Sequence, residues 1–230
     1  MKEMMKVIRI KDLTKVYSPS AGQEVRALDG VSLNVDKGEF VAVVGASGSG
    51  KTTLMNIIGC LDTPTEGEYR LDGTDVSALN GTQLSRVRSE KISFVFQGFN
   101  LIPTLTALEN VELPLIYRGV ESAARHRLSV SALQSVGLES RAEHLPAELS
   151  GGQQQRVAIA RALAADAPII LADEPCGNLD SRSGAAVMEM LHKLHRAGKT
   201  VVLITHDDNA ALTADRRIRI SDGKIVILNS

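Results

Sequence analysis

The chain has 230 residues, of which 43% are hydrophobic and 23% charged, enough for one substantial domain with a buried core. A formal net charge of −1 provides no basic excess, so composition argues against nucleic acid as a partner. The two cysteines, Cys60 and Cys176, are too few for a disulfide framework and lack metal-ligand spacing, which favours a reducing compartment.

The beginning of the chain predicts strands and no targeting segment. Residues 1–12 lack the continuous apolar stretch of a signal peptide, and no apolar run reaches the ~18 residues that cross a bilayer. We therefore expect a soluble protein that reaches a membrane only through a partner. Residues 6–12 alternate between apolar and polar, and residues 25–35 do so less strictly, which predicts two half-buried strands.

A phosphate-binding loop follows the next predicted strand. Residues 40–45 form an apolar run typical of a strand buried on both faces, GASGSGKT at 45–52 has the P-loop spacing, and TTLMNIIGCL predicts a helix. The glycines let successive N–H groups face one anion, Lys51 reaches the terminal phosphates, and the Thr52 hydroxyl can bind Mg²⁺. The expected nucleotide-binding residues here are Gly45, Ala46, Ser47, Gly48, Ser49, Gly50, Lys51, Thr52 and Thr53.

Helical spacing dominates the middle of the chain. Three stretches between Phe99 and Asp166 show it. We expect them to be broken at Pro114, Gly119, Gly137 and Pro146. The pattern predicts one domain, with a helical subdomain at about 99–166 inserted into an α/β core formed by residues 1–98 and 167–230.

The sequence LSGGQ opens the last of these helices. Ser150 and Gln153 have the spacing of a capping box. Gly151 and Gly152 are costly in a first helical turn, and they expose backbone N–H groups to a close ligand. This would be a second anion site in a chain whose P-loop already provides one. A two-fold dimer explains both, with Ser150–Gln153 facing the γ-phosphate on the partner's P-loop.

Two further apolar runs end at polar residues. IILAD at 169–173 is followed by Glu174, and VVLIT at 201–205 is followed by His206. Ligands in open α/β sheets bind beyond the carboxyl ends of strands. Asp173 can therefore hold Mg²⁺ while Glu174 orients or deprotonates the attacking water. The tail, residues 216–228, predicts a hairpin that turns at Asp222-Gly223.

With these motifs in this order, the chain resembles an ATP-binding cassette ATPase, the nucleotide-binding subunit of an ABC transporter, over essentially its whole length. The resemblance implies a P-loop α/β fold with a mostly parallel buried sheet, N-terminal antiparallel strands and an inserted helical subdomain. It also implies ATP and Mg²⁺ as cofactors, and an ATP-dependent homodimer. An integral membrane permease would hold it at the cytoplasmic face of the inner membrane, with no role for nucleic acid.

The resemblance also assigns roles to single residues. Gln97 resembles the Q-loop glutamine that touches Mg²⁺ and senses the membrane subunit. His206 resembles the switch histidine at the γ-phosphate, and Tyr17 the aromatic residue that stacks on adenine. By residue type alone, a surface amide, a structural histidine and a packing aromatic would also suit these positions. The segment that resembles the D-loop, which links the two sites of the dimer, is Asn178-Leu179-Asp180.

The implied magnesium ligands are therefore Thr52, Gln97 and Asp173, and the implied catalytic residues are Glu174 and His206. Position 176, often Thr or Ser in this family, is Cys here. We expect Cys176 to be a small buried residue, although a thiol near the dimer interface would make activity oxidant-sensitive.

Three segments narrow the resemblance further. LMNIIGCLD, the region around LTALENVELPL, and GNLDSRSG resemble the macrolide-exporter and lipoprotein-release subfamily. The expected function is ATP hydrolysis that drives a membrane subunit to export or extrude lipoprotein, peptide or drug. A cassette that regulates a cell-envelope or division partner remains an alternative. A cassette of DNA repair or translation would carry a coiled-coil insertion or a second cassette, and a P-loop kinase leaves LSGGQ unexplained.

Overall fold

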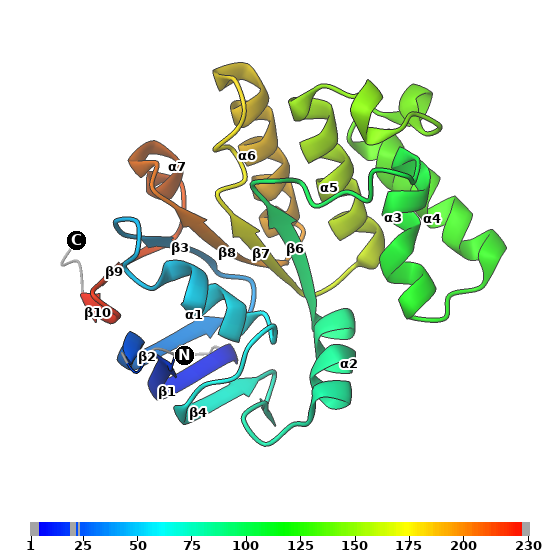
Figure 1. The fold of residues 1–230 in the computed structure, drawn as a ribbon. Helices are drawn as coiled ribbons and strands as arrows, with labels where there is room; N and C mark the ends of the chain where they lie inside the picture. Colours follow the sequence, from blue (N-terminus) through cyan, green and yellow to red (C-terminus); the bar gives the residue numbers. More distant parts are fainter. Residues whose placement is uncertain (1–4, 19–21, 23, 227–230) are drawn as a thin grey trace. The chain divides into compact units, whose positions relative to one another are not determined.

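The chain divides into two compact units in the computed structural model, which describes residues 5–18, 22 and 24–226 (Figure 1). The first unit comprises residues 1–88 and 198–230, and the second comprises residues 89–197. Among the described residues, no helix is long and apolar enough to cross a membrane. The single-domain organisation expected from the sequence stays a prediction.

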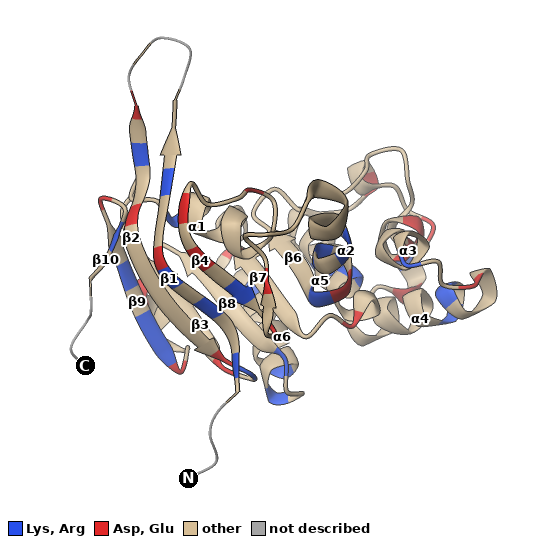
Figure 2. Ribbon diagram, turned by 90° about the horizontal axis from the view of Figure 1, so that it is seen from below, with Lys and Arg blue, Asp and Glu red and all other residues tan. Residues whose placement is uncertain are grey.

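An antiparallel sheet forms one part of the first unit. Its strand order is β2-β1-β4-β5, and the strands are β1 (Lys6–Tyr17), β2 (Val25–Asp36), β4 (Glu66–Leu71) and β5 (Thr74–Asp75). Ile8, Ile10 and Leu13 of β1 are buried, while the residues between them are exposed. The alternation in the sequence therefore correctly predicted half-buried strands in this region. Basic and acidic residues both occur along β1 and β4 (Figure 2).

Parallel strands form the other part of the first unit. They are β3 (Phe40–Val44), β8 (Thr200–Thr205) and β9 (Arg216–Ser221), with β3 paired to both of the others. All five residues of β3 are buried, as its unbroken apolar run predicted. Helix α1 (Lys51–Ile58) contacts β2 and β8, and α7 (Asp208–Leu212) contacts β3 and β8.

The predicted C-terminal hairpin is present in the first unit. Strand β9 pairs in antiparallel fashion with β10 (Lys224–Val226). Asp222 and Gly223 have φ angles of 48° and 73°, which suits the turn because both of its central residues need positive φ. Residues 227 and 228 of the expected hairpin lie outside the described part of the chain.

The second unit combines a parallel strand pair with helices. Strand β6 (Ile92–Phe96) pairs with β7 (Ile169–Asp173). The helices are α3 (Ala107–Tyr117), α4 (Ser122–Ser135), α5 (Gly151–Ala165) and α6 (Ser181–Arg196), with short 3₁₀ turns at Glu139–Arg141 and Pro146–Glu148. Figure 1 shows α3, α4 and α5 side by side, and α5 also contacts β6 and α6. The boundary between the two units, after Arg88, falls within helix α2 (Gly81–Lys91).

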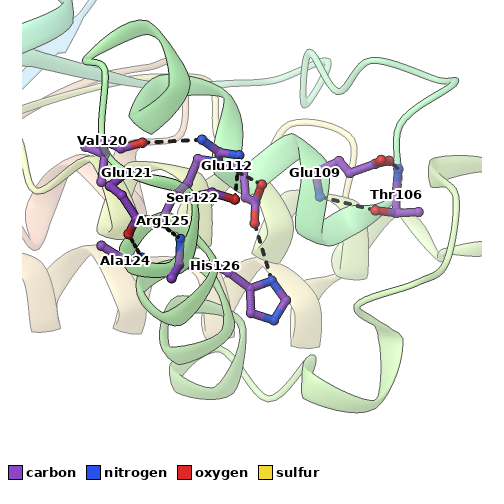
Figure 3. A network of polar contacts seen from close by, with 10 residues as sticks. Thr106, Glu109, Glu112, Val120, Glu121, Ser122, Ala124, Arg125 and His126 are labelled. Atoms are coloured by element: carbon purple, nitrogen blue, oxygen red, sulfur yellow. Dashed lines mark hydrogen bonds and ion pairs between the residues drawn. The ribbon is translucent and has the colours of Figure 1, made fainter.

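Polar contacts join α3 to α4 (Figure 3). The half-buried Glu112 carboxylate accepts a hydrogen bond from Arg125 Nε at 3.0 Å and lies 3.5 Å from the His126 ring. Thr106 and Glu109 form a capping box that begins α3. The helix then continues through Pro114, so the expected break there is wrong. Proline removes one backbone hydrogen bond, but Val111 and Leu115 on either side of it stay buried, and their packing maintains the helix.

Candidate nucleotide-binding site

The loop between β3 and α1 has the shape that its glycines require. Gly48 and Gly50 have φ angles of +77° and +107°, which side chains other than glycine rarely adopt. A Cβ on Gly45 would lie 2.3 Å from the Ile220 carbonyl oxygen, so the loop packs directly against β9. Helix α1 begins at Lys51 after Gly50, which has no side chain to cap it. Its first N–H groups therefore suit an anion.

Lys51 lies across this loop rather than pointing into solvent. Its Nζ donates hydrogen bonds of 2.7 Å to the carbonyl oxygens of Gly45 and Ala46, and the residue is only 9% exposed. The ammonium group is thus held at the mouth of the loop, where a phosphate oxygen could accept its third hydrogen bond. Ser49 is buried, and its hydroxyl lies close to Gly45.

Tyr17 lies at the end of β1, and both its hydroxyl and its ring contact charged side chains. Its hydroxyl donates to Asp62 Oδ2 at 2.8 Å, and Lys15 Nζ lies 4.9 Å from the ring centroid. Partial burial and the Asp62 carboxylate raise the pKa of the Tyr17 hydroxyl, while a hydrogen bond with the Thr53 side chain lowers it. Because Thr53 is in the first turn of α1, the structure places Tyr17 beside the start of that helix.

His206 follows β8, and the strand register places it near the P-loop. Val44 of β3 and Thr205 of β8 are register partners, so Gly45 and His206 leave the sheet at neighbouring positions. The Thr205 hydroxyl accepts a hydrogen bond from the Asp207 N–H at 3.0 Å, which fixes the turn around the exposed His206.

The second unit also places two predicted site residues directly after register partners on paired parallel strands. Phe96 of β6 and Asp173 of β7 are register partners, so Gln97 and Glu174 follow adjacent strand ends. Glu174 has a φ angle of +45°, a conformation that costs about 1 kcal/mol or more in a residue other than glycine. Its carbonyl oxygen accepts a 3.0 Å hydrogen bond from the Gly177 N–H. The result is a tight turn directly after Asp173, with Pro175 and Gly177 at positions that such turns favour.

Gln97 contacts the segment that resembles the D-loop. Its Nε2 donates to Asn178 Oδ1 at 3.2 Å, and Asn178 Nδ2 donates to the Gln97 carbonyl oxygen at 3.3 Å. A Cβ on Gly177 would lie 2.7 Å from Gln97 Nε2, so a larger residue at position 177 would displace the Gln97 side chain. The structure thus brings together two predicted site residues that are 81 positions apart.

The rest of this segment leads into α6. The Leu179 N–H donates to the Cys176 carbonyl oxygen at 3.1 Å. Asp180 caps α6 by accepting hydrogen bonds from the N–H groups of Arg182 and Ser183. The Ser183 hydroxyl also donates to Asp180 at 2.6 Å, and the hydrogen bonds from Ser183 lower the pKa of the Asp180 carboxyl.

The two cysteines occupy different surroundings. Cys176 is half-buried, and its Sγ lies 3.5 Å from the Gly184 carbonyl oxygen, so the expectation of a buried residue is only partly met. Cys60 is buried, and desolvation raises the pKa of its thiol to about 11. Of the two cysteines, Cys176 is therefore the more exposed residue.

The LSGGQ segment opens α5 with the predicted capping box. The Ser150 N–H donates to Gln153 Oε1 at 2.8 Å, and the Gln153 N–H donates to the Ser150 hydroxyl at 3.3 Å. The two glycines differ in a way the sequence did not reveal. A Cβ on Gly152 would lie 2.6 Å from Ser183 Oγ, whereas a Cβ on Gly151 would make only ordinary contacts, the nearest at 3.6 Å. Packing against α6 explains Gly152, whereas no close contact of this kind requires a glycine at position 151.

Sequence reasoning missed Gln155. This residue of α5 is fully buried, and its Nε2 donates to the Pro175 carbonyl oxygen at 2.6 Å. It therefore contacts the turn that begins at Glu174. Three consecutive glutamines, residues 153–155, gave no signal that distinguished the third from the second.

Comparisons with known proteins agree with this geometry. A family model described as "ABC transporter" matches residues 28–177. The macrolide export ATP-binding/permease protein MacB of Hyphomonas neptunium is 51% identical over 220 residues, which are 96% of this chain and 34% of that protein. The chain thus spans about a third of the length of this relative.

Two other relatives are similar over nearly their whole length. An ABC transporter ATP-binding protein of Thermotoga maritima, itself uncharacterized, is 51% identical over 223 residues, which are 96% of this chain and 94% of that protein. A solved dimeric structure of the ATP-binding cassette MJ0796, in a post-hydrolysis state bound to ADP and Pi, is 49% identical with a TM-score of 0.89. The match covers 96% of this chain and 97% of that one.

Proposed function

The chain belongs to the ABC transporter family, and from this premise we propose that it is an ATP-hydrolysing cassette that works as a homodimer and drives a membrane permease. The observation that carries the proposal is the loop around Lys51. It combines an ammonium group held by two loop carbonyls with the uncapped start of α1. Both features suit the phosphates of a nucleotide. We take residues 1–230 as one functional domain.

The donor chemistry fits ATP with Mg²⁺. The proposed magnesium ligands are the Thr52 hydroxyl, the Gln97 amide oxygen and the Asp173 carboxylate, all hard oxygen donors of the kind that Mg²⁺ prefers. When bound, Mg²⁺ neutralises charge on the terminal phosphates. Lys51 and the N–H groups of residues 45–53 bind the phosphates, and Tyr17 stacks on adenine.

Glu174 and His206 complete the proposed machinery. Glu174 orients or deprotonates the attacking water, and His206 contacts the γ-phosphate. The turn that begins at Glu174 and the turn around His206 support these roles because they fix the backbone from which each side chain projects. A carboxylate or imidazole at the end of a buried strand is held by the rigid sheet behind it.

The homodimer supplies the remaining contact. The start of α5 offers the exposed Ser150, and a Cβ on Gly151 would make only ordinary contacts. We propose that Ser150–Gln153 faces the γ-phosphate on the partner's P-loop, with Asn178, Leu179 and Asp180 coupling the two sites. The dimeric form of the MJ0796 cassette supports this arrangement.

The test is to replace Lys51 by alanine. Lys51→Ala should abolish ATP hydrolysis and weaken nucleotide binding, because a positive charge on the β- and γ-phosphates is lost. Lys11→Ala, at an exposed position of β1, is the control and should behave as wild type. Turnover and nucleotide affinity are the measurements. Wild-type turnover in Lys51→Ala would contradict the proposal that this loop binds the phosphates of ATP.

The partner is proposed from the relatives. The MacB relative is named as an ATP-binding/permease protein for macrolide export, and this chain matches about a third of it. We propose that an integral membrane permease binds the chain at the cytoplasmic face of the inner membrane and exports a drug, peptide or lipoprotein. A cassette that regulates a cell-envelope or division partner would use the same machinery. Identifying the membrane protein that co-purifies with the chain distinguishes these two functions.

A further inference from the structure

Gln155 makes a directed contact from the middle of the second turn of α5. The residue is 0% exposed, and its Nε2 lies 2.6 Å from the Pro175 carbonyl oxygen. A carbonyl oxygen only accepts hydrogen bonds, so the amide group that faces it must be the NH₂ and not the oxygen. The orientation of the side chain is therefore fixed by its partner.

The Pro175 carbonyl belongs to the turn that carries Glu174. The turn closes through the hydrogen bond between the Gly177 N–H and the Glu174 carbonyl oxygen, which leaves the Pro175 carbonyl for an external partner. Pro175 is buried, as is Gln155, so solvent cannot readily replace the amide. Because Glu174 has a φ angle of +45°, its backbone is strained and needs support from its surroundings.

The side-chain oxygen of Gln155 shows that the shape of the space around this residue does not by itself require glutamine. Among the described residues, Gln155 Oε1 is buried with no hydrogen-bond partner. A methionine would fill a similar volume without burying an unpaired oxygen. The amide therefore carries an energetic penalty at this position, and within the described part of the chain its one hydrogen bond is that to Pro175.

We propose that Gln155 is a positioning residue for ATP hydrolysis, which holds the Pro175–Cys176 peptide of the turn that begins at Glu174 and so fixes the direction of the Glu174 carboxylate. The inference rests on the proposed function, in which Glu174 activates the attacking water. Gln155 itself touches neither nucleotide nor water. It acts through the backbone turn, from the helix that begins with LSGGQ.

The experiment compares Gln155→Met with Gln154→Met. Gln154 is the matched control, because it is adjacent on α5 and its Nε2 donates to the Leu149 carbonyl oxygen at 3.1 Å, away from the Glu174 turn. We expect Gln155→Met to lower kcat about tenfold or more, because small misplacements of a catalytic group are costly, with KM for ATP and Tm unchanged. Gln154→Met should keep the wild-type kcat. If Gln155→Met does not fold, Gln155→Leu provides the same comparison.

A double-mutant cycle then separates positioning from general damage. Single-turnover hydrolysis is measured for Glu174→Gln with and without Gln155→Met. If Gln155 acts through the Glu174 carboxylate, the second substitution should cause no further loss. Multiplied losses, or wild-type kcat in Gln155→Met while Glu174→Gln is inactive, would overturn the positioning role and leave the proposed function intact. Wild-type turnover in Glu174→Gln would overturn both.

Discussion

Lys51 and Tyr17 are both oriented by contacts within the protein. The Lys51 ammonium donates hydrogen bonds to two loop carbonyls, and the Tyr17 hydroxyl donates one to the Asp62 carboxylate. Lys15 lies over the ring and also pairs with Asp62 at 2.7 Å. The Tyr17 ring is therefore fixed with little loss of side-chain freedom on binding, which favours a stacking role.

A substitution pair at position 17 tests that role. Tyr17→Ala should weaken ATP binding about tenfold, because stacking of a base on an aromatic ring contributes about 1–3 kcal/mol. Tyr17→Phe keeps the ring and loses the hydrogen bonds of the hydroxyl with Asp62 and Thr53, so its affinity should stay near wild type. Equilibrium titration with ATP measures both. Equal affinity of the alanine variant and wild type would assign Tyr17 to packing instead.

At the level of single residues, the sequence predicts local motifs but not contacts between distant segments. The motif residues could be predicted, because phosphate chemistry requires glycine, lysine and hydroxyl groups at fixed spacing within one segment. The pairing of Gln97 with Asn178 could not, because it depends on how β6 and β7 place segments that are 81 residues apart. Gln155 and Ser183 were missed for the same reason, since each matters through a contact with another element.

Among the secondary-structure elements, burial decides which ones the sequence reveals. Strands β3, β7 and β8 are almost fully buried, so their apolar runs were visible. Strand β4 buries only Tyr69 and Leu71, and α2 buries only Leu84, so neither shows a usable period. In contrast, α6 buries Val187, Leu191 and Leu194 at helical spacing. The apolar residues of this segment could therefore have predicted a helix, although the helix was not among the predicted elements.

The first turn of α5 separates a structural glycine from a functional one. A Cβ on Gly152 would lie too close to the Ser183 hydroxyl, while a Cβ on Gly151 would make only ordinary contacts. A loss of function at Gly152 would therefore be ambiguous, because packing against α6 would be lost as well. Gly151 is the position at which the proposed contact with the partner's nucleotide can be tested.

Gly151→Asp should eliminate hydrolysis and leave folding and ATP binding by the monomer intact. An acidic residue in the first turn of a helix is favourable for the helix dipole, by about 0.3–1 kcal/mol. The same charge would repel the γ-phosphate on the partner's P-loop. Stability and activity should therefore change independently, which thermal unfolding, nucleotide titration and turnover measure together.

The matched control is Ser122→Asp. Ser122 is the first residue of α4 and exposed, so it has the same helical position as Gly151 and no proposed role in binding. It should tolerate aspartate without loss of turnover. A Gly151→Asp variant that loses monomer binding as severely as turnover would contradict a contact made only across the dimer.

At the scale of the whole molecule, the proposed site residues are divided between the two units. The first unit holds the P-loop, Tyr17 and His206, and the second holds Gln97, Glu174 and the LSGGQ segment. In each unit, two of these residues follow register partners on paired strands. The LSGGQ contact is proposed to come from a second copy, so hydrolysis should depend on assembly as well as on each chain's own side chains.

Glu174→Gln is expected to trap this assembly. The amide preserves the shape of the carboxylate but cannot accept a proton, so the water is held and poorly activated. Asp173 still supports Mg²⁺ and both P-loops still bind ATP, so the γ-phosphates should keep bridging the two copies. Size-exclusion elution should show a dimer with ATP only, favoured at low salt, where polar contacts are less screened. The exposed Glu143→Gln is the control and should not accumulate a dimer. A Glu174→Gln variant that binds ATP yet stays monomeric would contradict the sandwich, and one that hydrolyses ATP at the wild-type rate would exclude Glu174 as the base.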